Sequence, residues 1–203
     1  MTSTLATDLL LIRHAPVVPD GRLAGRRDVH ADCSNGWRLG ELRARIGAFD
    51  HLIISPALRC LQTATALWPE RPEPETDQRL WEQDFGSWEG VAFERIPDLG
   101  SLEPEALVDM RPPGGESFGD LCARCSPSLE ELAGRGGRIA VVAHAGTVRA
   151  ALSLALGLRA AALSFHVAPL SLTQLTVRNG REWSIGSVNW SGLGRPREVG
   201  GDT

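Results

Sequence analysis

The segment DLLLIRHAP, residues 8–16, has the pattern of a buried strand that ends in two reactive side chains. Its four consecutive apolar residues, Leu9 to Ile12, are typical of a strand covered on both faces of a parallel sheet. The run ends at Arg13 and His14 and turns at Pro16. Side chains at the carboxyl end of a central parallel strand lie where α/β sheets bind ligands. On this segment alone, an Arg13 that solvates the strand end beside a packed His14 explains the sequence equally well.

A second segment, RIAVVAHAG at residues 138–146, repeats this arrangement. A buried strand is predicted over Ile139 to Ala143, with His144 at its end and a helix over Thr147 to Leu156. Neighbouring parallel strands would bring both imidazoles into one pocket, and the free amides at the start of the helix would add an anion-binding surface. Two histidines, an arginine and a helix N-terminus predict a site for a phosphoryl group.

The composition favours one α/β domain over residues 1–203. The formal net charge of −4 and the isoelectric point of about 5.7 give no sign of a nucleic-acid-binding or membrane-binding surface. All 21 basic residues are arginines, and the lack of lysine excludes Schiff-base chemistry and a P-loop lysine. The lack of tyrosine excludes a phenolic acid or base. Residues 194–203 are predicted to be a mobile tail.

The N-terminus has no basic region followed by a long apolar segment, and no apolar run approaches the length of a membrane span. We therefore expect a cytoplasmic protein. Four cysteines, at positions 33, 60, 122 and 125, fit a reducing compartment as small packing residues. Cys122 and Cys125 form a CxxC, but its surroundings, SFGDLCARC, are typical of a helix interior rather than of a zinc or redox site.

The segment SPALRCLQTATALWP, residues 55–69, predicts a helix that begins beside the strand Leu52 to Ile54. Ser55 is the expected N-cap, Pro56 suits the first helical position, and the helix is expected to end at Trp68. Arg59 then lies in the first turn, where a cation opposes the helix dipole. A phosphate bound between Arg59 and the helix N-terminus explains this placement. The alternative is that Arg59 is a surface arginine.

The loop Val17 to His30 is expected to form the rim of the site, because loops that leave a catalytic strand edge often do so. Its Arg22, Arg26 and Arg27 are candidates for contact with an anionic substrate. Solvated surface charge is the expected role for at least two of them.

The segment LWEQDFGSWEG, residues 80–90, offers three acids among aromatic residues: Glu82, Asp84 and Glu89. A carboxyl group in such surroundings suits a general acid. The sequence of this segment does not indicate which of the three acids is the general acid.

The remaining elements follow from local patterns. They are an amphipathic helix over Trp37 to Phe49, a partly helical region over residues 91–113, a helix that begins with the capping box of Ser117 and Asp120, and a hairpin turn at Asn179 and Gly180.

LLLIRHAP resembles the RHG signature of the histidine phosphatase superfamily, also called phosphoglycerate-mutase-like. SPALRCLQTA, LWEQDFGSWEG, PPGGES and VVAHAGTVRAAL resemble its other motifs, in the same order, and together they span residues 9–152. The resemblance implies a three-layer α/β/α sandwich with a mostly parallel central sheet.

The resemblance also implies roles for the site residues. His14 is the implied nucleophile, Glu82 the implied proton donor, and Arg13, Arg59, His144 and the backbone amide of Ala145 the implied phosphate pocket. We expect neither a cofactor nor a metal ion, since the five histidines show no HxH or HExxH spacing.

The chain departs from the family pattern directly after the nucleophile. Ala15, Pro16 and Val17 replace the usual Gly, Glu or Gln, and Ser or Thr, so a hydroxyl that often lines the pocket is missing. Asp20 stands where the family commonly has Asn, and an anion there would repel phosphate. We assign no role to Asp20. Ala145 replaces the first glycine of the second histidine motif.

The sequence thus predicts a metal-independent phosphoric monoester hydrolase that acts on a small phosphorylated substrate through a phosphohistidine. α-Ribazole 5'-phosphate is a candidate substrate, because the chain length and LWEQDFGSWEG are similar to α-ribazole phosphatases. The alternatives are a cofactor-dependent phosphoglycerate mutase and a catalytically silent phospho-ligand-binding protein. We expect no nucleic-acid or membrane partner, and we leave the oligomeric state open, with a homodimer as one option.

Overall fold

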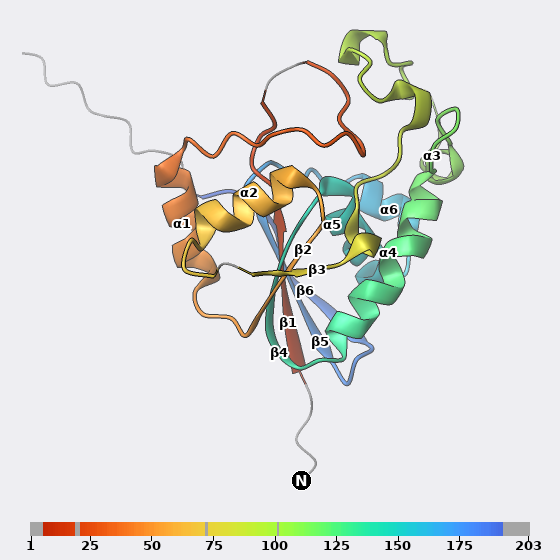
Figure 1. Cartoon of the computed structure of the whole chain (residues 1–203). Helices are drawn as coiled ribbons and strands as arrows, with labels where there is room; N and C mark the ends of the chain where they lie inside the picture. The colour runs from red at the N-terminus through yellow and green to blue at the C-terminus, as the bar shows by residue number, and fades with distance from the viewer. Residues whose placement is uncertain (1–5, 19–20, 72, 101, 193–203) are drawn as a thin grey trace, which may run out of the picture.

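A mixed six-stranded sheet in the order β3-β2-β4-β1-β5-β6 lies between two layers of helices in the computed structural model (Figure 1). The structure describes residues 6–18, 21–71, 73–100 and 102–192, so Asp20 and the tail 194–203 lie outside the described residues. The strands are β1 (Ala6–Arg13), β2 (His51–Ile54), β3 (Glu75–Thr76), β4 (Gly137–Ala143), β5 (Leu172–Arg178) and β6 (Glu182–Trp190). The α-helices are α1 (Gly36–Ile46), α2 (Leu58–Leu67), α3 (Pro104–Asp109), α4 (Phe118–Ala133), α5 (Ala145–Leu156) and α6 (Arg159–Leu163). Short 3₁₀ turns cover Gln78–Leu80, Gly86–Trp88 and Phe93–Arg95.

The apolar run of β1 is buried on both faces of the sheet. Leu9 and Leu11 pack with residues of α4 and α5, whereas Leu10 and Ile12 pack with residues of α1 and α2. This split follows from the alternation of side chains along a strand. Figure 1 shows α1 and α2 on one side of the sheet and α4, α5 and α6 on the other. The α/β/α sandwich is confirmed, and β3, β2, β4 and β1 are its parallel part.

β1 and β4 are parallel neighbours in the centre of the sheet. Arg13 pairs with Ala143, and the amide of His14 donates to the carbonyl of Ala143 at 3.0 Å. His14 and His144 therefore leave adjacent strands at the same edge, as predicted. The chain continues from β1 toward α1 on one face and from β4 into α5 on the other. Such a divergence creates the crevice in which α/β sheets bind ligands.

Several local patterns are confirmed. Ser117 and Asp120 form the capping box of α4, with the amide of Asp120 donating to Oγ of Ser117 at 3.1 Å. The β5–β6 hairpin turns at Asn179 (φ 53°) and Gly180 (φ 69°). Cys122 lies inside α4 as a free thiol, and so does Cys125. Within the described ranges, no helix is both long and apolar enough to cross a membrane.

Three helix boundaries differ from the predicted ones. α1 ends at Ile46 rather than Phe49, because Gly47 adopts a φ of 66° that ends the helix. α5 begins at Ala145, two residues before the predicted start, which makes His144 its N-cap. α2 begins at Leu58, and Ser55 is not its cap. The partner that Ser55 has instead is part of the site described below.

Candidate active site

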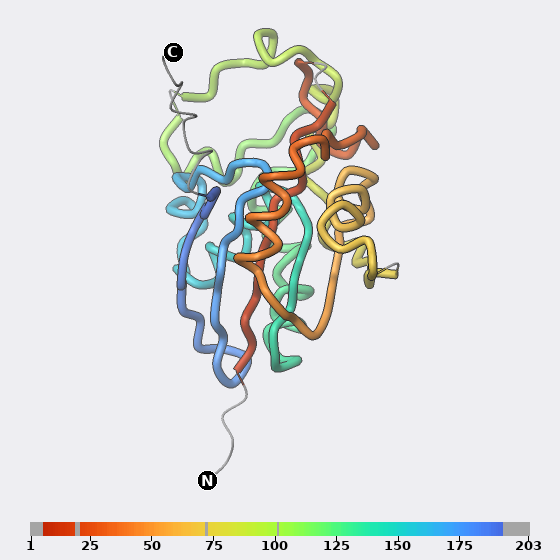
Figure 2. Tube along the Cα trace, turned by 90° about the vertical axis from the view of Figure 1, so that its left-hand side faces the viewer, coloured from red at the N-terminus to blue at the C-terminus, as the bar shows by residue number. Residues whose placement is uncertain are grey.

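A cavity of about 260 Å³ lies at the carboxyl ends of β1 and β4. The loop after β1 and the segment between residues 82 and 117 cover this end of the molecule (Figures 1 and 2). Backbone hydrogen bonds join these two segments, from Leu23 to Val91 and from Gly90 to Leu23. The cavity brings together six residues that the sequence assigned to the site or its rim: Arg13, His14, Arg22, Arg59, Glu82 and Ala145. Its wall also includes Val17, Phe85, Phe93, Phe118 and Leu163.

The hydrogen bonds of His14 define which ring nitrogen carries the proton. Nδ1 lies 2.7 Å from the carbonyl oxygen of Ala15, which can only accept, so Nδ1 is the protonated nitrogen. Nε2 accepts the Nε–H of Arg59 at 3.3 Å, so Nε2 carries the lone pair. The ring thus presents an unprotonated nitrogen beside a guanidinium. This is the arrangement that nucleophilic attack by an imidazole requires.

Electrostatics keep this imidazole neutral. Burial, together with the positive charge of Arg59, lowers the pKa of His14 to about 3. The hydrogen bond to Ala15 opposes this shift, and Arg13 adds to it. Because only 5% of His14 is exposed, solvent screens these effects weakly. Near neutral pH the side chain is therefore uncharged.

Arg59, in the first turn of α2, is buried and ties the site to the rim loop. Its Nη1 and Nη2 donate to the carbonyls of Arg27 at 2.9 Å and Gly25 at 2.7 Å. Nη2 also lies 3.2 Å from Nδ1 of His144. The guanidinium is thus held between the two imidazoles and the loop. The predicted surface-arginine alternative is wrong, since Arg59 is 1% exposed.

His144 lies behind the cavity wall and is fully buried. Its ring centroid is 5.2 Å from that of His14, with an interplanar angle of 67°. Burial and the nearby Arg59 lower its pKa well below the usual value, so this imidazole is also neutral. Nε2 of His144 lies 2.7 Å from Oγ of Ser55. Because the guanidinium of Arg59 can only donate to Nδ1, the neutral ring carries its proton on Nε2 and donates it to the hydroxyl of Ser55.

The contact with His144 explains why the predicted N-cap at Ser55 is wrong. The hydroxyl bonds the imidazole, and α2 starts three residues later at Leu58. The amide of Leu58 donates to Oδ1 of Asp28 at 2.7 Å, so a carboxylate from the rim loop caps α2 instead. Local preference indicates a helix start in this segment, but a partner 89 residues away determines where Ser55 points.

Arg13 supplies a second guanidinium with unused hydrogen-bonding capacity. Nη1 donates to the carbonyl of Val167 at 2.6 Å. The buried Nε has no partner among the described residues. Since a buried donor without an acceptor is costly, this position suits an oxygen atom of a bound anion.

Only one of the three candidate acids lines the cavity, and it is Glu82. Asp84 caps the 3₁₀ turn by accepting the amide of Gly86 at 2.8 Å. Glu89 accepts the amides of Arg26 at 2.7 Å and Phe85 at 3.1 Å. Glu82 also accepts a backbone amide, that of Gln83 at 3.0 Å on Oε1, but it is the one acid of the three whose side chain lines the cavity.

Arg124 of α4 holds the segment that carries Glu82, and sequence reasoning did not identify it. Its guanidinium donates to the carbonyls of Arg79 at 2.8 Å, Trp81 at 3.0 Å and Glu82 at 3.2 Å. Glu116 binds the same guanidinium at 2.9 and 2.8 Å. No sequence signal marks Arg124, because the contacts by which it holds the Glu82 segment are made to backbone carbonyls.

The motifs EQDFGSWEG and PPGGES contact each other through their backbones. The amide of Glu116 donates to the carbonyl of Asp84 at 2.7 Å, and that of Ser87 to Pro113 at 3.0 Å. A Cβ on Gly115 would lie 2.8 Å from the amide nitrogen of Gly86, which itself has a φ of 52°. Glycine is required on both sides of this contact.

These features match those of a known protein family. A family model described as the histidine phosphatase superfamily (branch 1) matches residues 9–191. The chain belongs to the histidine phosphatase superfamily.

Individual relatives of this superfamily member differ in their described activities. The bifunctional protein Rv2228c of Mycobacterium tuberculosis (strain ATCC 25618 / H37Rv) is 34% identical over 166 residues, covering 74% of this chain and 44% of that protein. The chain thus spans less than half the length of this relative. The 2,3-bisphosphoglycerate-dependent phosphoglycerate mutase of Rhizobium etli is 33% identical over 160 residues, covering 70% of the chain and 76% of the mutase.

A solved structure shows the same fold. The native mycobacterial glucosyl-3-phosphoglycerate phosphatase Rv2419c matches with a TM-score of 0.78 and 24% identity, over 92% of this chain and 100% of that chain.

The residues that depart from the superfamily motif lie beside His14. Ala15 is fully buried, and its amide donates to Oγ1 of Thr63 at 2.9 Å. Thr63 in turn donates to the carbonyl of Arg59 at 2.7 Å. Val17 lines the cavity where the motif usually has a hydroxyl. The segment directly after His14 and the backbone of Arg59 are thereby linked through a threonine of α2.

The three rim arginines separate in space. Arg22 lines the cavity, and its Nη1 donates to the carbonyl of Gly90 at 2.7 Å. Arg26 forms an ion pair with Glu116 at 2.9 Å and lies outside the cavity lining, as does Arg27. Arg22 is thus the one member of this trio that the structure brings to the site.

Arg149 of α5 also lines the cavity, and sequence reasoning did not single it out. Its position was readable in VVAHAGTVRAAL. It lies four residues after Ala145 and three after Gly146, so on a helix it shares their face. Both of these residues also line the cavity.

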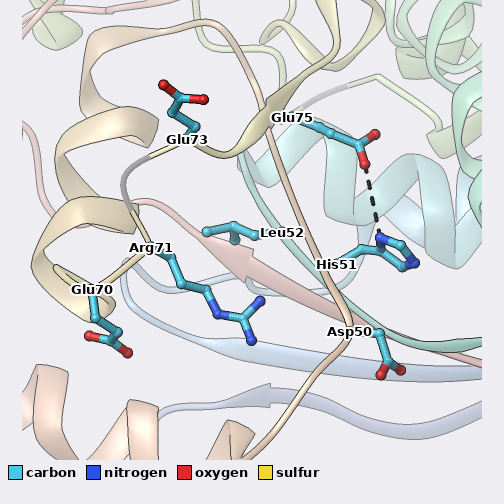
Figure 3. Close-up of a pocket in the computed structure, with 7 residues that line it drawn as sticks. All are labelled: Asp50, His51, Leu52, Glu70, Arg71, Glu73 and Glu75. Atoms are coloured by element: carbon cyan, nitrogen blue, oxygen red, sulfur yellow. Dashed lines mark ion pairs between the residues drawn. The ribbon is translucent and has the colours of Figure 1, made fainter.

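A larger hollow, of about 460 Å³, lies at the amino end of β2 (Figure 3). Two of its side chains have partners nearby: Nδ1 of His51 is 3.9 Å from Oε1 of Glu75, and Arg71 donates to the carbonyl of Phe49 at 3.1 Å. The hollow is thus a surface feature at the end of the sheet opposite the histidines. Among the described residues, no group of three or more His, Cys, Asp or Glu could hold a metal ion.

Proposed function

We propose that this chain is a metal-independent phosphomonoesterase that hydrolyses a small phosphate ester through a phosphohistidine at Nε2 of His14. The observation that carries the proposal is the state of His14, a neutral imidazole whose lone pair lies 3.3 Å from the Nε of Arg59. The phosphatases among the relatives and solved structures support the reaction class.

The first step transfers the phosphoryl group to the protein. Nε2 of His14 attacks phosphorus, and the bond from phosphorus to the ester oxygen breaks. Arg13 and Arg59 neutralise the negative charge on the equatorial oxygens through charge-assisted hydrogen bonds. Glu82 donates its proton to the departing oxygen, which leaves as an alcohol. Positioning and charge stabilisation are the main requirements of phosphoryl transfer.

The second step releases phosphate. The Glu82 carboxylate takes a proton from water, whose oxygen attacks phosphorus as the bond to Nε2 breaks. Inorganic phosphate leaves, and His14 and the protonated Glu82 are restored. The positive charge that a metal ion would supply comes here from Arg13 and Arg59, so no metal ion takes part.

We propose water rather than a second phosphate ester as the acceptor. A mutase must grip a diphosphorylated intermediate, which requires a second set of cations on a lid that faces the nucleophile. Of the rim arginines, Arg26 is bound to Glu116, Arg27 lies outside the cavity lining, and Arg22, which lines the cavity, donates to the carbonyl of Gly90. The 33% identity to a phosphoglycerate mutase makes mutase activity the alternative to test.

The decisive experiment traps the intermediate. The protein is mixed briefly with a ³²P-labelled ester in the presence of EDTA, and two portions are denatured, one in alkali and one in acid. Alkali preserves phosphohistidine, whereas acid cleaves it. We expect alkali-stable, acid-labile label and turnover of p-nitrophenyl phosphate in the wild type and in His51→Ala, which alters an exposed histidine. Label or turnover that persists in His14→Ala would overturn the assignment.

Two further outcomes separate the alternatives. Interconversion of 3- and 2-phosphoglycerate that is stimulated by the bisphosphate and exceeds hydrolysis would identify a mutase. Binding of phosphate esters with neither label nor turnover would identify a silent binding protein. A panel of monoesters that includes α-ribazole 5'-phosphate then compares candidate substrates by kcat/KM.

A further inference from the structure

Leu170 lies in a tight turn, in a backbone conformation that leucine rarely adopts. The turn spans Ala168 to Ser171, and the amide of Ser171 donates to the carbonyl of Ala168 at 3.2 Å. Pro169 occupies the second position of the turn, and Leu170 has a φ of 54° at the third. Proline at the second position and a positive φ at the third define a type II turn, whose third residue is normally glycine or asparagine. Leu170 is thus a large side chain at a position that favours glycine.

This turn is hydrogen-bonded to the end of β1, where two site residues lie. The amide of Leu170 donates to the carbonyls of Arg13 at 3.1 Å and His14 at 3.3 Å. The amide of Arg13 donates in return to the carbonyl of Ser171 at 3.2 Å. The carbonyl of Val167, directly before the turn, accepts Nη1 of Arg13 at 2.6 Å. The backbone and the guanidinium of Arg13 are therefore both fixed by one short segment.

The surrounding structure holds Leu170 in this conformation. Its side chain is 3% exposed and packs in the core on the side of α1 and α2. Nη2 of Arg38 donates to the Leu170 carbonyl at 3.0 Å. Oδ1 of Asn189 accepts the amide of Ala168, the first residue of the turn, at 2.7 Å. Strained backbone persists where its neighbours determine it in this way, and such positions cluster at functional sites.

We propose that Leu170 is a positioning residue: its left-handed backbone conformation sets the end of β1, so that Arg13 and His14 face the transferred phosphoryl group. This inference rests on the phosphatase function proposed above. The φ angle of Leu170 lies between its own amide and the carbonyl of Ser171. At a negative φ, these two groups could not both bond the backbone of Arg13. Phosphoryl transfer depends on the placement of the reacting groups, and a shift of about 1 Å can cost about a hundredfold in rate.

The test replaces Leu170 with side chains of similar size that differ in their tolerance of a positive φ. Leu170→Met is unbranched at Cβ, so it should keep wild-type kinetics. Leu170→Ile conserves the side-chain volume, but its branched Cβ opposes the left-handed conformation. We expect Leu170→Ile to lose about tenfold to a hundredfold in kcat/KM for p-nitrophenyl phosphate. The Ki of orthovanadate, a mimic of the transferred phosphoryl group, should rise by a similar factor.

The Ki of orthovanadate separates positioning from stability. A smaller folded fraction lowers the apparent kcat, but it changes neither the KM nor the Ki of the molecules that remain folded. Asn179→Ile is the matched control, because it places the same side chain at a φ of 53° at the opposite end of β5. This control should lower the Tm and keep the wild-type Ki.

A glycine at position 170 separates the backbone from the side chain. Leu170→Gly accepts the left-handed conformation without strain but leaves a cavity in the core. We expect its Tm to fall below that of Leu170→Met, while the Ki of orthovanadate stays within about threefold of the wild-type value. Leu170→Asn, which also tolerates this conformation, takes its place if the glycine variant does not fold.

Each outcome decides a different point. Unchanged kcat/KM and Ki in Leu170→Ile overturn the inference and leave the phosphatase intact. An equal rise of the Ki in Leu170→Gly would show that the apolar side chain, rather than the backbone conformation, is required, and that also overturns the inference. An equal rise in Asn179→Ile would reflect a general loss of structure and has the same consequence. A wild type that neither hydrolyses p-nitrophenyl phosphate nor forms phosphohistidine overturns the proposed function itself.

Discussion

Glu82 lies so close to Gly146 that a Cβ atom on this glycine would overlap Oε1 of the carboxylate. The same Cβ would lie 2.6 Å from Cδ2 of Leu121. Gly146 is the second residue of α5, directly after Ala145 in the cavity wall. The start of this helix thus fixes how near the proposed proton donor can approach the phosphoryl site.

Gly146→Ala should therefore displace Glu82 without unfolding α5. Alanine is intrinsically better than glycine inside a helix by about 0.5–1 kcal/mol, so the helix itself tolerates the change. We expect kcat for an alkyl phosphate to fall at least about tenfold, a part of what general acid catalysis contributes. Gly40→Ala in α1, where a Cβ would meet nothing within 4 Å, is the control and should keep full activity. Unchanged kcat in Gly146→Ala would mean that Glu82 does not act from this position.

Glu82→Gln should reveal general acid catalysis through the leaving group. An alkoxide needs a proton as it departs, whereas p-nitrophenolate leaves well without one. We expect the variant to lose about 10²-fold or more on alkyl phosphates and far less on p-nitrophenyl phosphate. Asp84→Asn and Glu89→Gln, which alter acids bound to the backbone, should not show this selectivity. Equal losses of Glu82→Gln on both esters would indicate a positional role instead.

The sequence alone could predict the sheet centre because each signal there is local and strong. An apolar run that ends in Arg13 and His14, and another that ends in His144, identify two buried strands and their carboxyl ends. The choice of Glu82 over Asp84 and Glu89 came from the family resemblance. The structure adds a physical reason, since Glu82 lines the cavity and the other two acids do not.

The contacts that sequence reasoning missed join side chains to distant backbone. Ser55 looked like a helix cap, yet its partner is His144 on another strand. Arg124 binds three carbonyls, and carbonyls carry no residue identity that a pattern could reveal. The spacing between Arg149 and the pair Ala145 and Gly146 is visible in the sequence. It places the three residues on one helix face only when α5 is known to begin at Ala145.

Arg124→Gln should reproduce the leaving-group selectivity of Glu82→Gln. Arg124 does not touch the cavity, but its guanidinium positions the carbonyl of Glu82 and those of two residues before it. We expect a loss on alkyl phosphates that exceeds the loss on p-nitrophenyl phosphate, with Arg124→Lys recovering part of it. Arg135→Gln, which removes an exposed ion pair with Glu75, is the control. A uniform loss on both esters, with a lowered Tm, would indicate that Arg124 only stabilises the fold.

The buried histidines should make stability depend on pH. In the folded protein, burial and Arg59 lower the pKa of His14 to about 3, and the pKa of His144 is also well below its usual value. In the unfolded chain a histidine titrates near a pKa of about 6.5. As the pH falls from about 7 toward 3, the unfolded state binds protons that the folded state does not, so the free energy of unfolding falls. Each histidine contributes a slope of up to about 1.4 kcal/mol per pH unit in this window.

Urea unfolding of the wild type and of His14→Asn between pH 7.5 and 4.5 measures this contribution. The lower pH limit avoids protonation of Asp77. Burial raises the pKa of this carboxyl group, but its hydrogen bonds with Arg79 and Ser128 outweigh that effect and lower the pKa to about 2. We expect the free energy of unfolding to fall less steeply with decreasing pH in His14→Asn, because one buried neutral imidazole has been removed. His51→Ala, at an exposed position, should follow the wild-type slope. Parallel curves for the wild type and His14→Asn would mean that His14 binds protons equally in the folded and unfolded states, so burial would not hold its imidazole neutral.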